Sequence, residues 1–150
     1  MPFMIDPKML DALSSSIYLS RLQLKGATVD DDDKRIRASG LYDDWSAGVH
    51  TVGQIYNAAG QTWECYQAYD NATPPDIAPG ADAWFTFNRP LHGRSAETAR
   101  PWVAPTHAED IYRNGEYMIW TDGTTKRCVA ANGTNFSPDE YPAGWETYTT

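Results

Sequence analysis

The sequence predicts a mainly β protein, in which a short N-terminal α-helix precedes two small three-stranded antiparallel β modules that form a pseudo-repeat. Three observations predict this class. Helical periodicity is confined to the first 25 residues, turn residues recur about every 8 to 12 residues after Leu41, and two later segments share Gly, Cys and Pro positions. The length of 150 residues suits one domain or two very small ones.

Charge and hydropathy disfavour several classes of partner. The chain carries 12 Lys and Arg against 20 Asp and Glu, a net charge of −8, whereas phosphate-rich partners are bound by clustered basic side chains. No apolar run approaches the roughly 20 residues that cross a bilayer, and the first residues lack the basic and apolar regions of a secretory signal. We therefore expect no nucleic-acid partner and no membrane insertion.

The first element is a helix over residues 6–25, within an N-terminal segment 1–26 that we expect to dock or self-associate. Asp6 suits the N-cap and Pro7 the first helical position. An apolar stripe recurs at helical spacing, formed by Leu10, Leu13, Ile17 and Leu24. A lone amphipathic helix is marginal in water, so this stripe must be buried, either on its own domain or against other chains. Contact with other chains is favoured because the segment that follows looks like a spacer.

Residues 27–40 are expected to form an acidic turn and a possible strand. Asp30–Asp33 is a run of four aspartates, and a charge run of this kind is typical of a solvated turn or linker. A calcium site is the weaker alternative, because calcium loops alternate their ligands instead of placing them in succession. Over residues 34–39 the apolar Ile36 and Ala38 alternate with polar residues, which is compatible with a strand.

The most informative feature is a repeat in the second part of the chain. Residues 41–87 form the first copy, residues 101–150 the second, and residues 88–100 an irregular connector. The alignment pairs Gly53 with Gly115, Gly60 with Gly123, Cys65 with Cys128, Ala68 with Ala131, Pro75 with Pro138, Pro79 with Pro142, and Trp84 with Trp145. Each copy is predicted to contain a strand, a tight turn, a return strand, a Pro-containing loop and a closing strand.

A spaced pattern of aromatic, Gly and Pro residues runs through the first copy. It consists of Trp45, Gly48, Val52, Gly53, Ile55, Asn57, Gly60, Trp63 and Cys65, followed by Pro74, Pro75 and Trp84. This pattern resembles the short chitin-binding-type carbohydrate-binding modules of families five and twelve, and most of all the versions in bacteriophage and prophage tail proteins. In those proteins the modules follow a short N-terminal helix and can occur in tandem.

The resemblance implies a non-enzymatic tail or baseplate protein of a bacteriophage virion, made in the cytoplasm of the bacterial host. The implied partners are other tail or baseplate proteins, further copies of the chain in a homo-oligomer, and glycans of the host surface. The alternative is a stand-alone chitin- or polysaccharide-binding module associated with a glycoside hydrolase. The virion protein is favoured because we detect neither a catalytic domain nor a secretion signal.

The candidate glycan-binding residues are aromatics with polar neighbours, because a sugar presents both an apolar ring face and hydroxyl groups. They are Tyr66, Tyr69, Asp70, Asn71 and Trp84 in the first copy, and Phe136, Tyr141 and Trp145 in the second. Tyr69 is the favoured contact because it stands beside Asp70 and Asn71, whereas core packing is favoured for Trp84 and for the aromatics of the second copy. The first copy is expected to bind, because residues 131–133 of the second (Ala-Asn-Gly) lack the adjacent aromatics of the chitin-binding modules.

The sequence contains no recognisable catalytic or metal-binding motif. The three histidines are scattered without metal-ligand spacing, and no Gly-rich phosphate loop is present. Cys65 and Cys128 hold equivalent repeat positions, so each is expected to be a small buried residue of its own module, and a disulfide between them is disfavoured. We therefore expect a protein that is not an enzyme and that needs neither metal nor cofactor.

Overall fold

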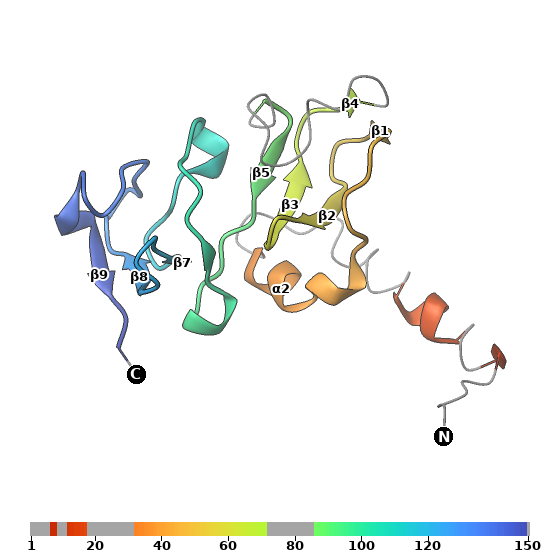
Figure 1. The fold of residues 1–150 in the computed structure, drawn as a ribbon, viewed down its shortest axis with the longest axis horizontal. Helices are drawn as coiled ribbons and strands as arrows, with labels where there is room; N and C mark the ends of the chain where they lie inside the picture. The colour runs from red at the N-terminus through yellow and green to blue at the C-terminus, as the bar shows by residue number, and fades with distance from the viewer. Residues whose placement is uncertain (1–6, 9–11, 18–31, 72–85, 150) are drawn as a thin grey trace.

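The computed structural model describes residues 7–8, 12–17, 32–71 and 86–149, and these form a mainly β fold, as the sequence predicts. Two β modules lie next to each other, the first coloured from orange-yellow to green and the second from green to blue (Figure 1). Residues 7–8 and 12–17 are helical, within the helix expected at the N-terminus. No helix in the described part of the chain is long and apolar enough to cross a membrane.

The first module contains a three-stranded antiparallel sheet in the order β2-β3-β5 and an antiparallel pair of β1 and β4. Its strands are β1 (Val49–His50), β2 (Ile55–Ala58), β3 (Gln61–Cys65), β4 (Tyr69–Asp70) and β5 (Asn88–Pro90). Strands β2 and β3 are joined by a two-residue turn in which Ala59 and Gly60 both have positive φ, 52° and 75°. This turn has the twist that paired strands prefer, but alanine is unusual in it because its Cβ crowds the left-handed conformation.

The second module is a four-stranded sheet in the order β6-β7-β8-β9. Its strands are β6 (Arg100–Pro101), β7 (Tyr117–Ile119), β8 (Thr125–Cys128) and β9 (Trp145–Thr147). Strand β6 pairs with β7 in parallel, whereas β7, β8 and β9 form an antiparallel unit like that of the first module. Three short 3₁₀ helices accompany the sheet, η4 (Ala96–Thr98), η5 (Ala108–Asp110) and η6 (Pro142–Gly144).

The backbone hydrogen bonds of the two modules match at the predicted repeat positions. The Gly53 amide donates to the Cys65 carbonyl at 2.8 Å, and the Gly115 amide donates to the Cys128 carbonyl at the same distance. Both glycines have φ of 89°, which their lack of a Cβ permits. Cys65 and Cys128 are buried and free, so the expectation of two small buried residues in equivalent strands is confirmed.

The predicted register of the closing strand is wrong. Cys128 lies opposite Trp145, but the residue opposite Cys65 is Asn88, and Trp84 lies outside the described residues. Strand β5 therefore falls within the segment 88–100 that was expected to be a connector. Matching one tryptophan with the other assumed a loop two residues shorter in the second copy, whereas the strand pairing makes it six residues shorter.

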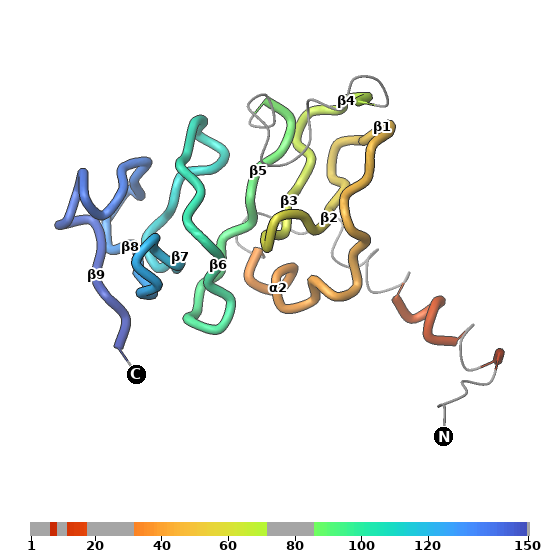
Figure 2. The backbone as a smooth tube through the Cα atoms, viewed as in Figure 1, coloured from red at the N-terminus to blue at the C-terminus, as the bar shows by residue number. Residues whose placement is uncertain are grey.

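Within the acidic segment, the described residues 32–40 contain a short helix and not a surface turn followed by a strand. Residues Asp32–Arg37 form α2, which lies beside the β2–β3 end of the first module (Figure 2), and η2 (Ser39–Leu41) follows it. Asp32 is 1% exposed, and Ile36 packs with Ile55 and Leu91 in a buried cluster. The two apolar residues whose alternation was compatible with a strand are Ile36, which lies in this helix, and Ala38, which directly follows it.

A buried ionic network holds α2 on the sheet. The two Asp32 carboxylate oxygens accept hydrogen bonds from Arg89 at 2.8 and 2.9 Å. Arg89 Nε also donates to Glu64 at 2.9 Å, and Arg35 Nη1 lies 3.2 Å from the same carboxylate. Burial lowers the pKa of the Arg89 guanidinium, but its bonds to Asp32 and Glu64 outweigh burial and raise that pKa, so it stays charged. The network thus joins α2 to β3 and β5.

The segment between β5 and β6 joins the two modules. The Gly93 carbonyl accepts a hydrogen bond from the Tyr117 amide of β7 at 2.9 Å. A Cβ at Gly93 would lie 2.3 Å from the Thr98 carbonyl oxygen, so only glycine allows this close approach. Each module keeps its own buried cluster, with Tyr56, Cys65 and Tyr69 in the first and Tyr112, Met118, Cys128, Ala130 and Trp145 in the second.

Candidate functional site

Tyr69, the favoured sugar contact, is a core residue. Its side chain is 6% exposed and packs with Tyr56 and Cys65, flanked by Trp45 and Phe87. The Tyr69 hydroxyl accepts a hydrogen bond from Trp45 Nε1 at 2.9 Å and lies 2.8 Å from the Tyr56 hydroxyl. A ring held in this way cannot offer a face to a ligand, so the assignment of Tyr69 as an exposed platform is wrong.

The other candidates of the first copy do not form one site. Asn71 is fully buried, and its Oδ1 accepts a hydrogen bond from the Gly48 amide at 3.0 Å, whereas the neighbouring Asp70 is exposed. Tyr66 is half-buried beside His107 of the second module, with ring centroids 6.4 Å apart. Burial and the carboxylates of Glu109 and Asp110 raise the pKa of Tyr66. Trp84 lies outside the described residues.

Trp145 is also a core residue, so a sugar contact there is wrong. It is 7% exposed and its ring meets Trp102 and Tyr112 edge-on, with centroids 5.9 and 5.3 Å away. Its Nε1 donates to the Phe136 carbonyl at 3.0 Å and thereby fixes the backbone of Phe136. Phe136 itself is 49% exposed, which agrees with its selection as a candidate.

Phe136 and Tyr141 border a shallow cavity of about 350 Å³, which we call the aromatic hollow. Its lining consists of residues 130–136 and Tyr141. Tyr141 is 38% exposed, and its ring rests on Gly144, where a Cβ would lie 2.9 Å from the ring. The loop turns at Gly133 with φ of 77°, close to the Tyr112 carbonyl. The hollow thus combines exposed ring surface with the exposed side chains of Asn132 and Asn135.

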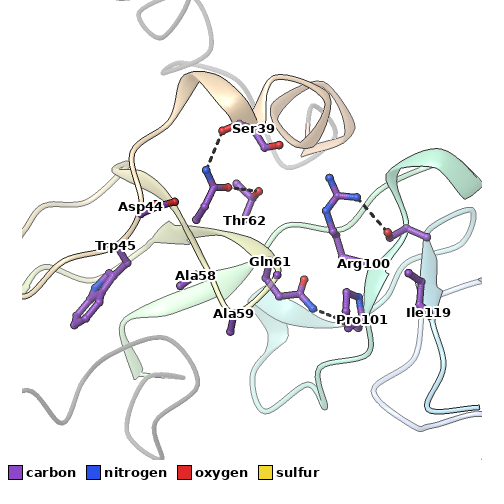
Figure 3. A pocket seen from close by; sticks show the side chains of 13 residues that line it. Ser39, Asp44, Trp45, Ala58, Ala59, Gln61, Thr62, Arg100, Pro101 and Ile119 are labelled. Carbon is purple, nitrogen blue, oxygen red and sulfur yellow. Dashed lines mark hydrogen bonds between the residues drawn. The ribbon is translucent and has the colours of Figure 1, made fainter. Parts of the chain in front are cut away.

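A second and larger cavity, of about 700 Å³, lies where the two modules meet (Figure 3), and we call it the inter-module cavity. Its described lining comprises Ser39, Asp44, Trp45, Asn57, Ala58, Ala59, Gly60, Gln61, Thr62, Ala99, Arg100, Pro101 and Ile119. Nothing in the sequence pattern pointed to it, because its walls come from the β2–β3 turn and from β6, about 40 residues further along the chain. Of the lining residues, Trp45, Asn57 and Gly60 belong to the spaced pattern of the first copy, which predicted no cavity.

Internal hydrogen bonds hold the walls of the inter-module cavity in place. Asn57 Nδ2 donates to the Ser39 carbonyl at 2.9 Å, and Thr62 Oγ1 donates to Asn57 Oδ1 at 2.8 Å. Gln61 Nε2 crosses to the other module and donates to the Pro101 carbonyl at 2.5 Å. These polar groups are therefore committed to the protein, whereas Arg100 uses one hydrogen bond, from Nη1 to the Ala99 carbonyl at 3.2 Å.

The described residues contain no group of three or more His, Cys, Asp or Glu that could hold a metal ion. The buried acid Glu116 accepts hydrogen bonds from the Arg113 amide at 2.7 Å and from Arg113 Nη2 at 3.0 Å, and lies 3.3 Å from His92 Nδ1. Burial raises the pKa of Glu116, but its bonds to His92 and Arg113 outweigh burial and lower that pKa overall. Because Glu116 is fully buried, it serves the packing of the second module.

The apolar stripe of the N-terminal helix is described at two positions. Leu13 is 48% exposed and Ile17 is half-buried, whereas Leu10 and Leu24 lie outside the described residues. Because Leu13 is exposed, it is accessible to another chain. Assembly through this helix remains a prediction.

No protein-family model matches the chain, and no curated protein matches it.

Proposed function

We propose that this chain is a non-enzymatic accessory protein of a bacteriophage tail or baseplate, and that it contacts glycans of the host surface through its β modules. The resemblance of residues 41–87 to carbohydrate-binding modules supports this class, and the shared strand pairing of the two copies supports a tandem of modules. The aromatic hollow is the observation that carries the proposal, because it is an exposed aromatic surface with polar neighbours. It lies in the second copy, whereas the sequence predicts binding by the first.

The chemistry of the hollow suits a sugar. Phe136 and Tyr141 offer apolar surface to the face of a pyranose ring, while the amides of Asn132 and Asn135 can both donate to and accept from hydroxyl groups. One or two ring contacts give weak binding at a single site. Display of many copies on an oligomer raises the effective affinity, by a factor of about 10² to 10⁴ when the sites engage together.

Glycan binding is tested on an array that includes chitin oligosaccharides and peptidoglycan fragments. Phe136→Ala and Tyr141→Ala should each lower binding at least tenfold. Tyr148→Ala is the matched control, because Tyr148 is 40% exposed but packs against Tyr117, away from the hollow. Absence of glycan binding by the unmodified chain, or equal binding by all three variants, would overturn the role of the hollow.

Assembly is tested separately through the N-terminal helix. Leu13→Asp places a charge on the apolar stripe and should reduce the mass of the particle in light scattering to that of a single chain. Ser15→Asp, on the opposite side of the same helix and also exposed, should leave the mass unchanged. A single-chain mass for the unmodified protein would refute the proposed homo-oligomer.

A further inference from the structure

The inter-module cavity contains an arginine that has no acidic partner within the part of the chain that the structure describes. Ion pairs with carboxylates engage Arg35, Arg37, Arg89, Arg113 and Arg127. Arg100, by contrast, donates to the Ala99 carbonyl and has no carboxylate of the described residues within ion-pair distance. Acidic residues outnumber basic ones by 20 to 12, so a half-buried arginine that lacks one is unexpected on grounds of charge alone.

Arg100 is also held in position. Its strand β6 pairs in parallel with β7 through Met118 and Ile119, so the backbone that carries the guanidinium is part of a sheet. The guanidinium keeps most of its five N–H donors after the bond to Ala99, and its planar donors match the two oxygens of a carboxylate. The cavity therefore presents an anion-binding group on a rigid element.

Asp44 is the acidic residue of the described lining, and it stands on the other side of the cavity from Arg100 (Figure 3). The backbone around Asp44 is fixed, because the Trp45 amide donates to the Asn57 carbonyl at 2.8 Å and the Asn57 amide donates to the Asp43 carbonyl at 3.0 Å. An exposed carboxylate accepts hydrogen bonds from hydroxyl groups and repels a second anion. The Arg100 side of the cavity thus favours a negatively charged group, and the Asp44 side favours hydroxyl groups.

We propose that the inter-module cavity binds an acidic sugar, with the sugar carboxylate on Arg100 and its hydroxyl groups directed to Asp44. This inference rests on the proposed function for the sugar class, and it adds a second site with its own charge preference. The apolar surfaces of Pro101 and Ile119, which also line the cavity, can cover one face of the pyranose ring. The volume of about 700 Å³ lies within the usual range of small-molecule sites.

A small inorganic anion satisfies these features less well than an acidic sugar. It would meet Arg100 but leave Asp44 without a hydrogen-bond donor, and the carboxylate of Asp44 would weaken its binding. A neutral sugar would satisfy Asp44 but would offer the guanidinium only hydroxyl oxygens, which bind it more weakly than a carboxylate does. A ligand with a negative group at one end and hydroxyl groups at the other therefore suits both residues best.

The test is a titration of the full chain followed by amide resonances in two-dimensional NMR. The probes are D-galacturonate, D-glucuronate and N-acetylneuraminate, with D-galactose, D-glucose and inorganic phosphate as comparisons. The acidic sugars should produce saturable shifts at Arg100, Gln61 and Asp44, with dissociation constants at least tenfold lower than those of the neutral sugars and of phosphate. Arg100→Gln should abolish this preference, Arg100→Lys should retain part of it, and Asp44→Asn should weaken binding severalfold.

Arg127→Gln is the matched control, because Arg127 pairs with Glu146 on the surface of the second module. It should leave the titration unchanged. Equal affinity for acidic and neutral sugars, equal affinity for phosphate, or no saturable shift with any acidic sugar would each overturn the inference. The amides of Asn132, Gly133 and Asn135 report on the aromatic hollow in the same spectra, so loss of one site is distinguished from loss of the other.

Discussion

Replacing Asp32 with asparagine tests whether a single buried carboxylate holds α2 on the first module. The Asp32 oxygens lie 2.8 and 2.9 Å from Arg89, and one of them lies 3.4 Å from Arg35 Nη1. Asp32→Asn keeps the volume of the side chain but replaces one acceptor with an amide donor that faces a guanidinium. After this change Glu64 is the one carboxylate left to neutralise the two buried arginines Arg35 and Arg89, so one buried positive charge is no longer neutralised.

The expected loss of stability is large for a protein of this size. Removal of one partner from a buried ion pair lowers the free energy of unfolding by about 3 to 5 kcal/mol, out of a total of about 5 to 15 kcal/mol. With about 2 to 4 °C per kcal/mol, the thermal midpoint should fall by about 6 to 20 °C. Urea and thermal unfolding, followed by circular dichroism, measure both quantities.

Two further variants decide whether the burial of the pair is the cause. Glu146→Gln removes the acidic partner of Arg127 in a pair whose side chains are 40% and 53% exposed, and it should change stability little, because water screens such pairs. Arg89→Gln combined with Asp32→Asn should lose less stability than the sum of the single changes, because both act on one contact. The reasoning is refuted if Asp32→Asn is as mild as Glu146→Gln, or if the effects of the Asp32 and Arg89 changes add.

Three more substitutions have defined outcomes. Because the folded pKa of Glu116 lies below its ordinary value of 4.5, its ionised form stabilises the fold above that pH, and this contribution is lost as the pH falls through the folded pKa. Glu116→Gln should therefore be less stable than the unmodified chain at pH 7, and the difference in stability should narrow as the pH falls below 4.5; an unchanged difference would contradict this. Tyr69→Phe leaves Trp45 Nε1 without its acceptor and should lower the free energy of unfolding by about 1 to 3 kcal/mol, whereas Tyr148→Phe should not change it. Ala59→Asn suits the positive φ of the β2–β3 turn and should raise the urea midpoint, with a gain of up to about 1 kcal/mol; an unchanged midpoint would show that Ala59 is unstrained.

The repeat could be predicted from the sequence where local geometry dictates the residue. Gly53 and Gly115 are required by their positive φ, and Cys65 and Cys128 by small buried spaces in equivalent strands, so these positions mark the register. The closing strand carries no such marker. The closing strand is β5 in the first module and β9 in the second, and its register is set by hydrogen bonds to β3 or β8. The loop before it can differ in length between the copies, so matching Trp84 with Trp145 gave the wrong register.

The candidate site was harder to predict, because exposure is a property of the whole fold. Tyr69 stands beside polar residues, as an exposed aromatic would. Its burial depends on Trp45, Phe87 and Tyr56, which come from separate segments. Asp32 is one of four consecutive aspartates, and nothing nearby in the sequence indicates that Arg89, 57 residues away, neutralises it. Arg100 differs from the five ion-paired arginines by having no acidic partner among the described residues, which no local pattern can reveal.

The long sequence separation within the ionic network has a consequence for synthesis on the ribosome. Arg89 is made 57 residues after Asp32, an interval of about 3 to 11 s at about 5 to 20 residues per second. Asn88 of β5 is made 23 residues after Cys65 of β3, so β3 lacks its neighbour β5 for about 1 to 5 s of that interval. A strand with one unpaired edge is open to pairing with another nascent chain. When several ribosomes translate one message, neighbouring copies carry this open edge at the same time and close together, so misassembly of the first module would be most frequent when synthesis is fastest.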